Sequence, residues 1–197
     1  MEIHIDYNSD SLSKYYDRFY YKFDCCKTFI DFELVNKAYI KNRYNHGTFH
    51  DFMRLLNIEF DRKQLEKEYE TAFNVLQMCE KWEDIILTKD IFPKIQFDII
   101  IDSLTTADEI KLKDLVLNID DDLLNYLFPP NNFNDRTCVR KTRSLRQSND
   151  FIIPRIEKKF QNNVGKYFKI DVNDFFAIPF SEENLRIVED YYKKAHN

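Results

Sequence analysis

The stretch DRKQLEKEYETAFNVLQMCEKW at residues 61–82, followed past Pro93 by IQFDIII at residues 95–101, decides the fold. In the first part, apolar residues recur every three or four positions, which predicts an amphipathic helix of about six turns with Asp61 as its N-cap. In the second part, apolar residues form a short run rich in Ile, which predicts a buried strand. The chain therefore changes from helix-forming to strand-forming sequence at Pro93.

The residues before this stretch carry mainly helical patterns. Thr48 precedes an apolar periodicity and is expected to be an N-cap. The exception is the first seven residues, in which apolar and polar residues alternate as in a half-buried strand. Helices are expected at residues 10–23, 28–47 and 48–57.

The segment after the predicted strand supports two interpretations. Thr106, with Glu109 three residues later, forms a capping-box pattern, which predicts a helix over residues 106–116. The same segment alternates from Glu109 to Lys113, as the return arm of a hairpin does. We favour the helix and keep the hairpin as the alternative.

The remainder of the chain mixes short helices and strands. The expected elements are a helix after Asp120–Asp122 that ends at Pro129–Pro130, a helix from Pro154, a strand at 167–172 and a helix from Ser181. Together, the patterns predict an α+β fold: a predominantly helical single domain of residues 1–197 with a small β-sheet. Its helical part spans about residues 10–90, and its mixed part spans about residues 93–197, with an exposed basic excursion at 129–150.

Glycine occurs only twice, at Gly47 and Gly165. Backbone amides that cradle a phosphate need a residue without a side chain, so the P-loop, the dinucleotide fingerprint and the nucleophile elbow are excluded. Ala, Gly and Pro are scarce beside abundant Asn, Lys, Ile, Phe and Tyr. This composition favours an AT-rich genome, such as that of a virus or phage.

The net charge, the cysteines and the N-terminus indicate where in the cell the protein is expected and what it is not expected to bind. The net charge of -5 at pH 7 argues against a protein whose whole surface binds nucleic acid. The four cysteines have no CxxC spacing and are expected to be reduced. The N-terminus is acidic and no run approaches the ~18 apolar residues of a membrane span, so we expect no signal peptide and no membrane partner. We therefore expect an intracellular protein that is located in the cytoplasm, or in the host cytoplasm or nucleus if it is viral.

One segment is basic in an otherwise acidic chain. Within eleven residues it carries five positive charges, which we expect to bind a polyanion, either nucleic acid or an acidic protein surface. These residues are Arg136, Arg140, Lys141, Arg143 and Arg146. If residues 137–147 are helical, three of the arginines, at positions 136, 140 and 143, share one face.

A second candidate site joins Asp98 on the predicted strand to Glu109 and Lys111. Their spacing resembles that of metal-dependent nucleases of the PD-(D/E)xK type, in which acids hold divalent cations and a lysine orients or activates water. The resemblance requires the hairpin interpretation, because strand alternation is what places Glu109 and Lys111 on one face.

A third candidate is the pair Arg43 and His50, whose separation resembles the R-x6-H pattern of HEPN ribonucleases. In that family the arginine and the histidine act on an RNA phosphodiester. Here Tyr44 stands where a polar residue usually follows the arginine. His46 lies four residues before His50, but the cap at Thr48 is expected to leave His46 outside the helix, so no two-histidine metal site is predicted.

The sequence thus predicts a non-enzymatic intracellular interaction protein of viral, phage or mobile-element origin that binds nucleic acid or an acidic partner through its basic segment. The alternative is a nuclease that uses Asp98, Glu109 and Lys111, or Arg43 and His50. No metal and no cofactor are predicted.

Overall fold

The computed structural model describes residues 21, 23–26, 29–56, 60–103, 105–148 and 150–166. Four predicted elements fall wholly or largely outside these residues. They are the strand in the first seven residues, the helix at 10–23, the strand at 167–172 and the helix from Ser181.

By its internal contacts the chain divides into two compact units. The first comprises residues 1–69 and 178–197, and the second comprises residues 70–177. The chain is an α+β protein in which helices account for more residues than strands, so the predicted fold class is confirmed. The expectation of a single domain stays a prediction.

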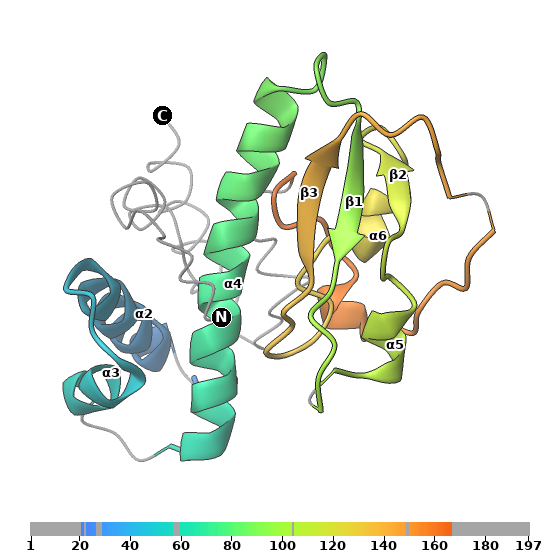
Figure 1. Ribbon diagram of the computed structural model, residues 1–197. Helices are drawn as coiled ribbons and strands as arrows, with labels where there is room; N and C mark the ends of the chain where they lie inside the picture. Colours follow the sequence, from blue (N-terminus) through green and yellow to red (C-terminus); the bar gives the residue numbers. More distant parts are fainter. Residues whose placement is uncertain are drawn as a thin grey trace. The chain divides into compact units, whose positions relative to one another are not determined.

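The described residues of the first unit form three helical segments: α2 (Phe29–Tyr44), α3 (Phe49–Leu55) and the N-terminal turns of α4 (Arg62–Leu87) (Figure 1). Thr48 caps α3, because its hydroxyl accepts the N–H of Asp51 at 3.3 Å and the Asp51 carboxylate accepts the N–H of Thr48 at 2.9 Å. The Asp61 carboxylate accepts two N–H groups of the first turn of α4, at 3.0 and 3.3 Å. The predicted caps at Thr48 and Asp61 are confirmed.

The core of the first unit is aromatic. The ring centroid of Tyr69 on α4 lies 5.3 Å from that of Tyr39 and 5.1 Å from that of Phe52. Phe23 lies 5.7 Å from Tyr39, and all four rings are buried. Tilted and edge-on ring pairs of this kind contribute about 0.5–1.5 kcal/mol each beyond the burial of their apolar area.

The turn between α2 and α3 depends on Asn42 and Gly47. Asn42 is buried, and its amide donates to the carbonyls of Gly47 and Thr48 and to the hydroxyl of Tyr69 (3.2, 3.1 and 2.7 Å). A Cβ atom at Gly47 would lie only 1.9 Å from the Asn42 Oδ1 atom. Position 47 therefore requires glycine, because the Asn42 side chain leaves no room for a Cβ atom.

Glu68 is a buried carboxyl group on α4, 1 % exposed. Its Oε1 atom accepts the N–H of Asp24 at 2.9 Å and the side-chain amide of Gln64 at 3.2 Å. Burial raises the pKa of Glu68 to about 8, and the negative charge of Asp24 adds to the rise while the hydrogen bonds from the Asp24 backbone and Gln64 oppose it. The protonated form is therefore the stable form of Glu68 at neutral pH.

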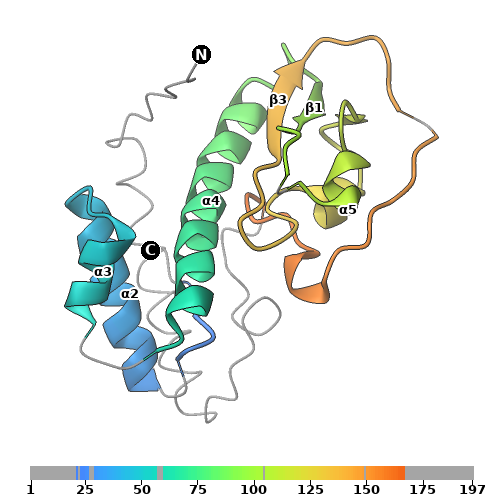
Figure 2. The same cartoon turned by 60° about the horizontal axis from the view of Figure 1, so that its bottom comes forward.

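The second unit is built on a three-stranded antiparallel sheet with the strand order β2-β1-β3. Its strands are β1 (Lys94–Asp98), β2 (Val116–Asn118) and β3 (Cys138–Thr142). Both views place β3 on the side of α4 (Figures 1 and 2). The buried face of the sheet carries Ile95, Phe97 and Val139, each 0 % exposed.

The C-terminal half of α4 packs through Trp82. Its ring meets Phe128 edge-on, with centroids 4.9 Å apart. The backbone of Gly165 passes close to the Trp82 side chain. A Cβ atom added to Gly165 would lie 2.1 Å from the Trp82 Cβ atom. Both glycines of the chain thus occupy positions where a side chain would collide with a buried neighbour.

The ambiguous segment after β1 contains both expected kinds of element. Thr106 and Glu109 form the predicted capping box, but the helix α5 (Ala107–Ile110) is shorter than predicted. The chain then turns at Asp114 and returns as β2, antiparallel to β1. The predicted strand at 95–101 ends earlier, at Asp98, because the pairing with β3 stops there.

Two further predictions need correction. The helix expected from Pro154 is absent from the described residues, where only the 3-10 turn η1 (Lys158–Phe160) forms. The exposed excursion expected at 129–150 is wrong for the first part of that segment, which contains the buried residues Asn131, Asp135 and Val139. The helix predicted after Asp120–Asp122 is present as α6 (Leu124–Leu127).

Replacing Glu68 by Gln should change how the stability depends on pH. The pKa of Glu68 is raised in the folded state, so its stabilising contribution is complete below its unfolded value of about 4.5 and is lost as the pH rises through about 8. Between pH 5 and pH 9, the urea midpoint of the wild type should fall relative to that of Glu68→Gln by an amount equivalent to a few kcal/mol. Glu66→Gln, on the exposed side of the same helix, is the control. A constant difference between wild type and Glu68→Gln at all pH values would contradict this expectation.

Alanine at Gly165 should destabilise the second unit by at least about 1–3 kcal/mol, because the new methyl group collides with Trp82. Trp82 is the only tryptophan, so its fluorescence emission should also shift in the native state. Gly47→Ala is the matched variant: it should lower the unfolding midpoint while leaving the native tryptophan emission unchanged, because its collision is with Asn42.

Candidate functional site

The basic segment forms β3 and the loop after it. β3 pairs with β1 from Cys138 opposite Asp98 to Thr142 opposite Lys94. The conditional expectation of a helix over 137–147 is therefore wrong, and so is the shared helical face of its arginines. Because strand side chains alternate, Arg140 and Lys141 point to opposite faces of the sheet.

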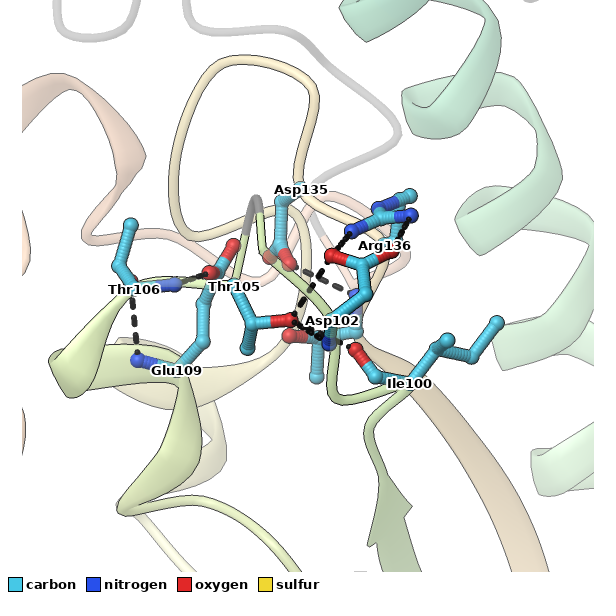
Figure 3. A network of polar contacts seen from close by, with 8 residues as sticks. Ile100, Asp102, Thr105, Thr106, Glu109, Asp135 and Arg136 are labelled. Carbon is cyan, nitrogen blue, oxygen red and sulfur yellow. Dashed lines mark hydrogen bonds and ion pairs between the residues drawn. The ribbon is translucent and has the colours of Figure 1, made fainter.

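Arg136, just before β3, is held in an ion pair. Its two terminal nitrogens donate to the two carboxylate oxygens of Asp102, at 2.7 and 2.6 Å (Figure 3). Asp102 is fixed in turn by Thr105, whose hydroxyl accepts the Asp102 N–H at 2.9 Å and donates to the Ile100 carbonyl at 2.8 Å. The charge of Arg136 is thus neutralised within the protein.

Lys141 is neutralised in the same way. Its Nζ atom lies 2.8 Å from the Asp84 carboxylate on α4 and 5.6 Å from the centre of the Phe92 ring. Because the side chain lies on the α4 side of the sheet, it joins β3 to the helix rather than facing solvent. Two of the five predicted polyanion-binding residues, Arg136 and Lys141, therefore have acidic partners of their own.

The other three, Arg140, Arg143 and Arg146, are exposed and form no ion pair with a described residue. Neutral groups hold two of them. Arg140 donates to the Gln96 side-chain oxygen at 2.9 Å, and Arg143 donates to the Ile91 carbonyl at 3.1 Å while its guanidinium lies 4.8 Å from the Phe92 ring centre. Such contacts orient the guanidinium groups without cancelling their charge.

Lys94 adds a fourth cation that the sequence reasoning missed. It shares the outer face of β1 with Gln96, the residue directly opposite Arg140. Its Nζ atom donates to the carbonyls of Leu145 and Arg146, both at 3.3 Å, and so anchors the loop after β3. We call Lys94, Arg140, Arg143 and Arg146 the basic face. Lys94 and Arg140 lie on the outer face of the sheet, whereas Arg143 contacts Phe92, the ring that Lys141 also approaches. The alternation around Lys94 was visible in the sequence, but its pairing partner was not.

The arrangement needed for a PD-(D/E)xK-like site does not form. Glu109 caps α5 through the N–H of Thr106, and Lys111 pairs with Asp108, Nζ to Oδ1 2.6 Å. Neither residue lies on a strand beside Asp98, so the strand arrangement expected of the three residues is wrong. Within the described ranges, no three His, Cys, Asp or Glu side chains are placed so that they could hold a metal ion.

Arg43 is half-buried and lies against the aromatic core of the first unit. Its guanidinium donates to the Tyr69 hydroxyl at 3.1 Å and lies 5.5 Å from the centre of that ring. His50 is exposed on α3, and His46 adopts a left-handed backbone (φ 51°) outside the helices, as expected. The packing of Arg43 accounts for its position, and its catalytic role with His50 stays an untested prediction.

Asp135 organises the segment that leads into β3. It is 3 % exposed and accepts the N–H groups of Asn131 and Thr137 at 2.6 and 2.7 Å. Burial raises the pKa of Asp135, and hydrogen bonds from Thr137 and Asn131 oppose the rise. Figure 3 shows Asp135 near Arg136.

Comparison with protein-family models, with curated proteins and with solved structures finds no match. None of the described helices combines the length and the apolar character needed to cross a membrane.

Replacing Asp135 by Ala should lower the free energy of unfolding by at least about 2 kcal/mol, because two buried N–H groups lose their acceptor. Asp135→Asn keeps one acceptor oxygen and should cost less than Asp135→Ala. Urea unfolding followed by circular dichroism measures both. Equal stability of Asp135→Ala and wild type would show that the carboxylate does not organise the segment.

Proposed function

We propose that this protein is a non-enzymatic intracellular interaction protein that binds a polyanion through its basic face, and that the polyanion is nucleic acid. The observation that carries the proposal is the contrast within the basic segment: Arg136 and Lys141 have acidic partners, whereas Arg140, Arg143 and Arg146 are exposed without one in the described chain. Three unneutralised arginines on one strand and its following loop are unusual on a chain of net charge -5.

The anchoring of the basic face supports this function physically. A guanidinium has five donors, and the contacts to Gln96 and Ile91 use one donor of Arg140 and one of Arg143. The remaining donors face solvent and fit phosphate or carboxylate oxygens. Because these side chains are already oriented, less conformational entropy is lost on binding.

The loop after β3 favours nucleic acid over an acidic protein surface. Leu145 is 99 % exposed between Arg143 and Arg146. Proteins that bind the minor groove of DNA insert apolar side chains such as leucine between base steps, while cations contact the phosphates. Such a role also agrees with a protein that keeps its cysteines reduced inside a cell.

The double variant Arg140→Gln/Arg143→Gln should weaken binding to single-stranded RNA or DNA by at least about tenfold and flatten its salt dependence. With four phosphate contacts, the wild type should show a slope of about −3 for log K against log salt, and the variant about half of that. Fluorescence anisotropy of labelled oligonucleotides, at salt concentrations from about 50 to 200 mM, measures both the affinity and its salt slope.

The control is Arg136→Gln/Lys141→Gln, which removes the same net charge from the two residues that already have acidic partners. It should keep most of the affinity and the full slope. Identical losses in the two double variants would refute the assignment of the basic face. If the wild type binds a polyglutamate peptide but no oligonucleotide, the partner is an acidic protein surface and nucleic acid is excluded.

A further inference from the structure

Two cysteines, Cys25 and Cys26, follow each other in a turn of the first unit. The Cys26 N–H donates to the Phe23 carbonyl at 2.9 Å, which closes a four-residue turn. Helix α4 holds the same turn, because Glu68 accepts the Asp24 N–H at 2.9 Å. The backbone that carries the two thiols is therefore held both from within the turn and from α4.

The two thiols interact with each other and differ in exposure. Cys25 is half-buried, whereas Cys26 is 3 % exposed. A hydrogen bond between the two side chains is the largest cause that raises the pKa of Cys26, and burial and the charges of Cys25, Asp31 and Glu68 add to the rise. One thiol of the pair is thus reachable from solvent, and the other is a buried neutral thiol in contact with it.

The other two cysteines have different partners. Cys79 is buried, and its thiol donates to the Val164 carbonyl at 3.4 Å. Cys138 is exposed, and its thiol donates to the Val139 carbonyl at 3.6 Å. Among the four cysteines, the pair in the turn is therefore the place where two thiols can act on one ligand.

A direct disulfide fits this pair poorly. The peptide bond between Cys25 and Cys26 is trans, so their Cα atoms are about 3.8 Å apart. The Cα atoms of a disulfide are usually about 4.4–6.8 Å apart. Disulfide exchange also starts from a thiolate, which burial and the nearby carboxylates disfavour at Cys26. A bridge with a further atom between the two sulfur atoms is longer and avoids this restriction.

A zinc ion does not fit the pair either. Structural zinc takes four protein ligands, and no three His, Cys, Asp or Glu side chains of the described residues are placed to hold a metal ion. Trivalent arsenic is three-coordinate and soft, so it prefers sulfur and can keep one substituent of its own when two thiols bind it. Two adjacent thiols supply the two ligands that such a centre needs.

From these observations we infer that Cys25 and Cys26 form a binding site for a trivalent arsenical. In water, phenylarsine oxide is present as its hydrate, which carries two As–OH groups. Each thiol replaces one hydroxyl: an As–S bond forms, an As–O bond breaks, and the thiol proton leaves with the hydroxyl as water. Arsenic stays trivalent, so nothing is oxidised or reduced.

The difference in exposure sets the order of the two steps. Cys25 reacts first because it is reachable from solvent, and the bond to Cys26 is then intramolecular. An intramolecular second step has an effective concentration of about mM or more, so two-point binding is much tighter than binding to one thiol. The site lies in the first unit and the basic face lies in the second, so the inference does not depend on polyanion binding.

The test uses the full chain in a phosphine reductant with phenylarsine oxide as the probe. Native mass spectrometry should show one arsenical per chain, and two of the four free thiols should become unreactive. The adduct should survive an excess of mercaptoethanol, a monothiol, and should be lost with dimercaptopropanol, a dithiol, because one competing thiol replaces only one of two bonds. Absence of an adduct, or an adduct that mercaptoethanol removes, would overturn the inference.

Matched variants identify the residues. Cys25→Ser and Cys26→Ser each leave one thiol and should bind the arsenical at least about tenfold more weakly. Cys79→Ser and Cys138→Ser should bind it as the wild type does. Circular dichroism checks the fold of each variant, and Cys25→Ser decides the question if Cys26→Ser does not fold, because Cys25 is only half-buried. Unchanged binding in Cys25→Ser, or loss of binding in Cys138→Ser, would overturn the assignment.

Discussion

The pairing of β1 with β3 decides which positive charges of this protein reach solvent. Once Lys94–Asp98 and Cys138–Thr142 are in antiparallel register, alternation turns Lys141 toward α4 and Arg140 toward solvent. The same register places Lys94 where it anchors the following loop. A segment that is uniformly basic in sequence is thereby divided into charges that serve the fold and charges that remain available for a partner.

The helices of the first unit and α4 were predictable because their signals are local. Thr48 and Asp61 sit directly before apolar periodicities, and the hydrogen bonds that make them caps span two or three residues. β3 was not predictable in this way. It contains one buried residue, Val139, and its partners on β1 lie forty or more residues away, so neither hydrophobic alternation nor a nearby turn marks it.

The candidate sites show the same division. Clustering of arginines along the chain was visible, but the acids that neutralise Arg136 and Lys141 come from Asp102 and Asp84, 34 and 57 residues away in sequence. Glu109 was predicted as part of a capping box with Thr106, and it does cap α5, because both hydrogen bonds of that box are local.

The close approaches at Gly47 and Gly165 have a consequence for how this sequence can vary. Every other backbone position carries a side chain, and among the described residues His46, Asp114 and Asn134 adopt the left-handed conformation, so glycine is not needed here for its conformational freedom. It is needed because there is no room for a Cβ atom beside Asn42 and Trp82. In homologues, a side chain at position 165 should therefore be accompanied by glycine at position 82, because the collision is with the Trp82 Cβ atom, and a side chain at position 47 should be accompanied by a residue smaller than Asn at position 42.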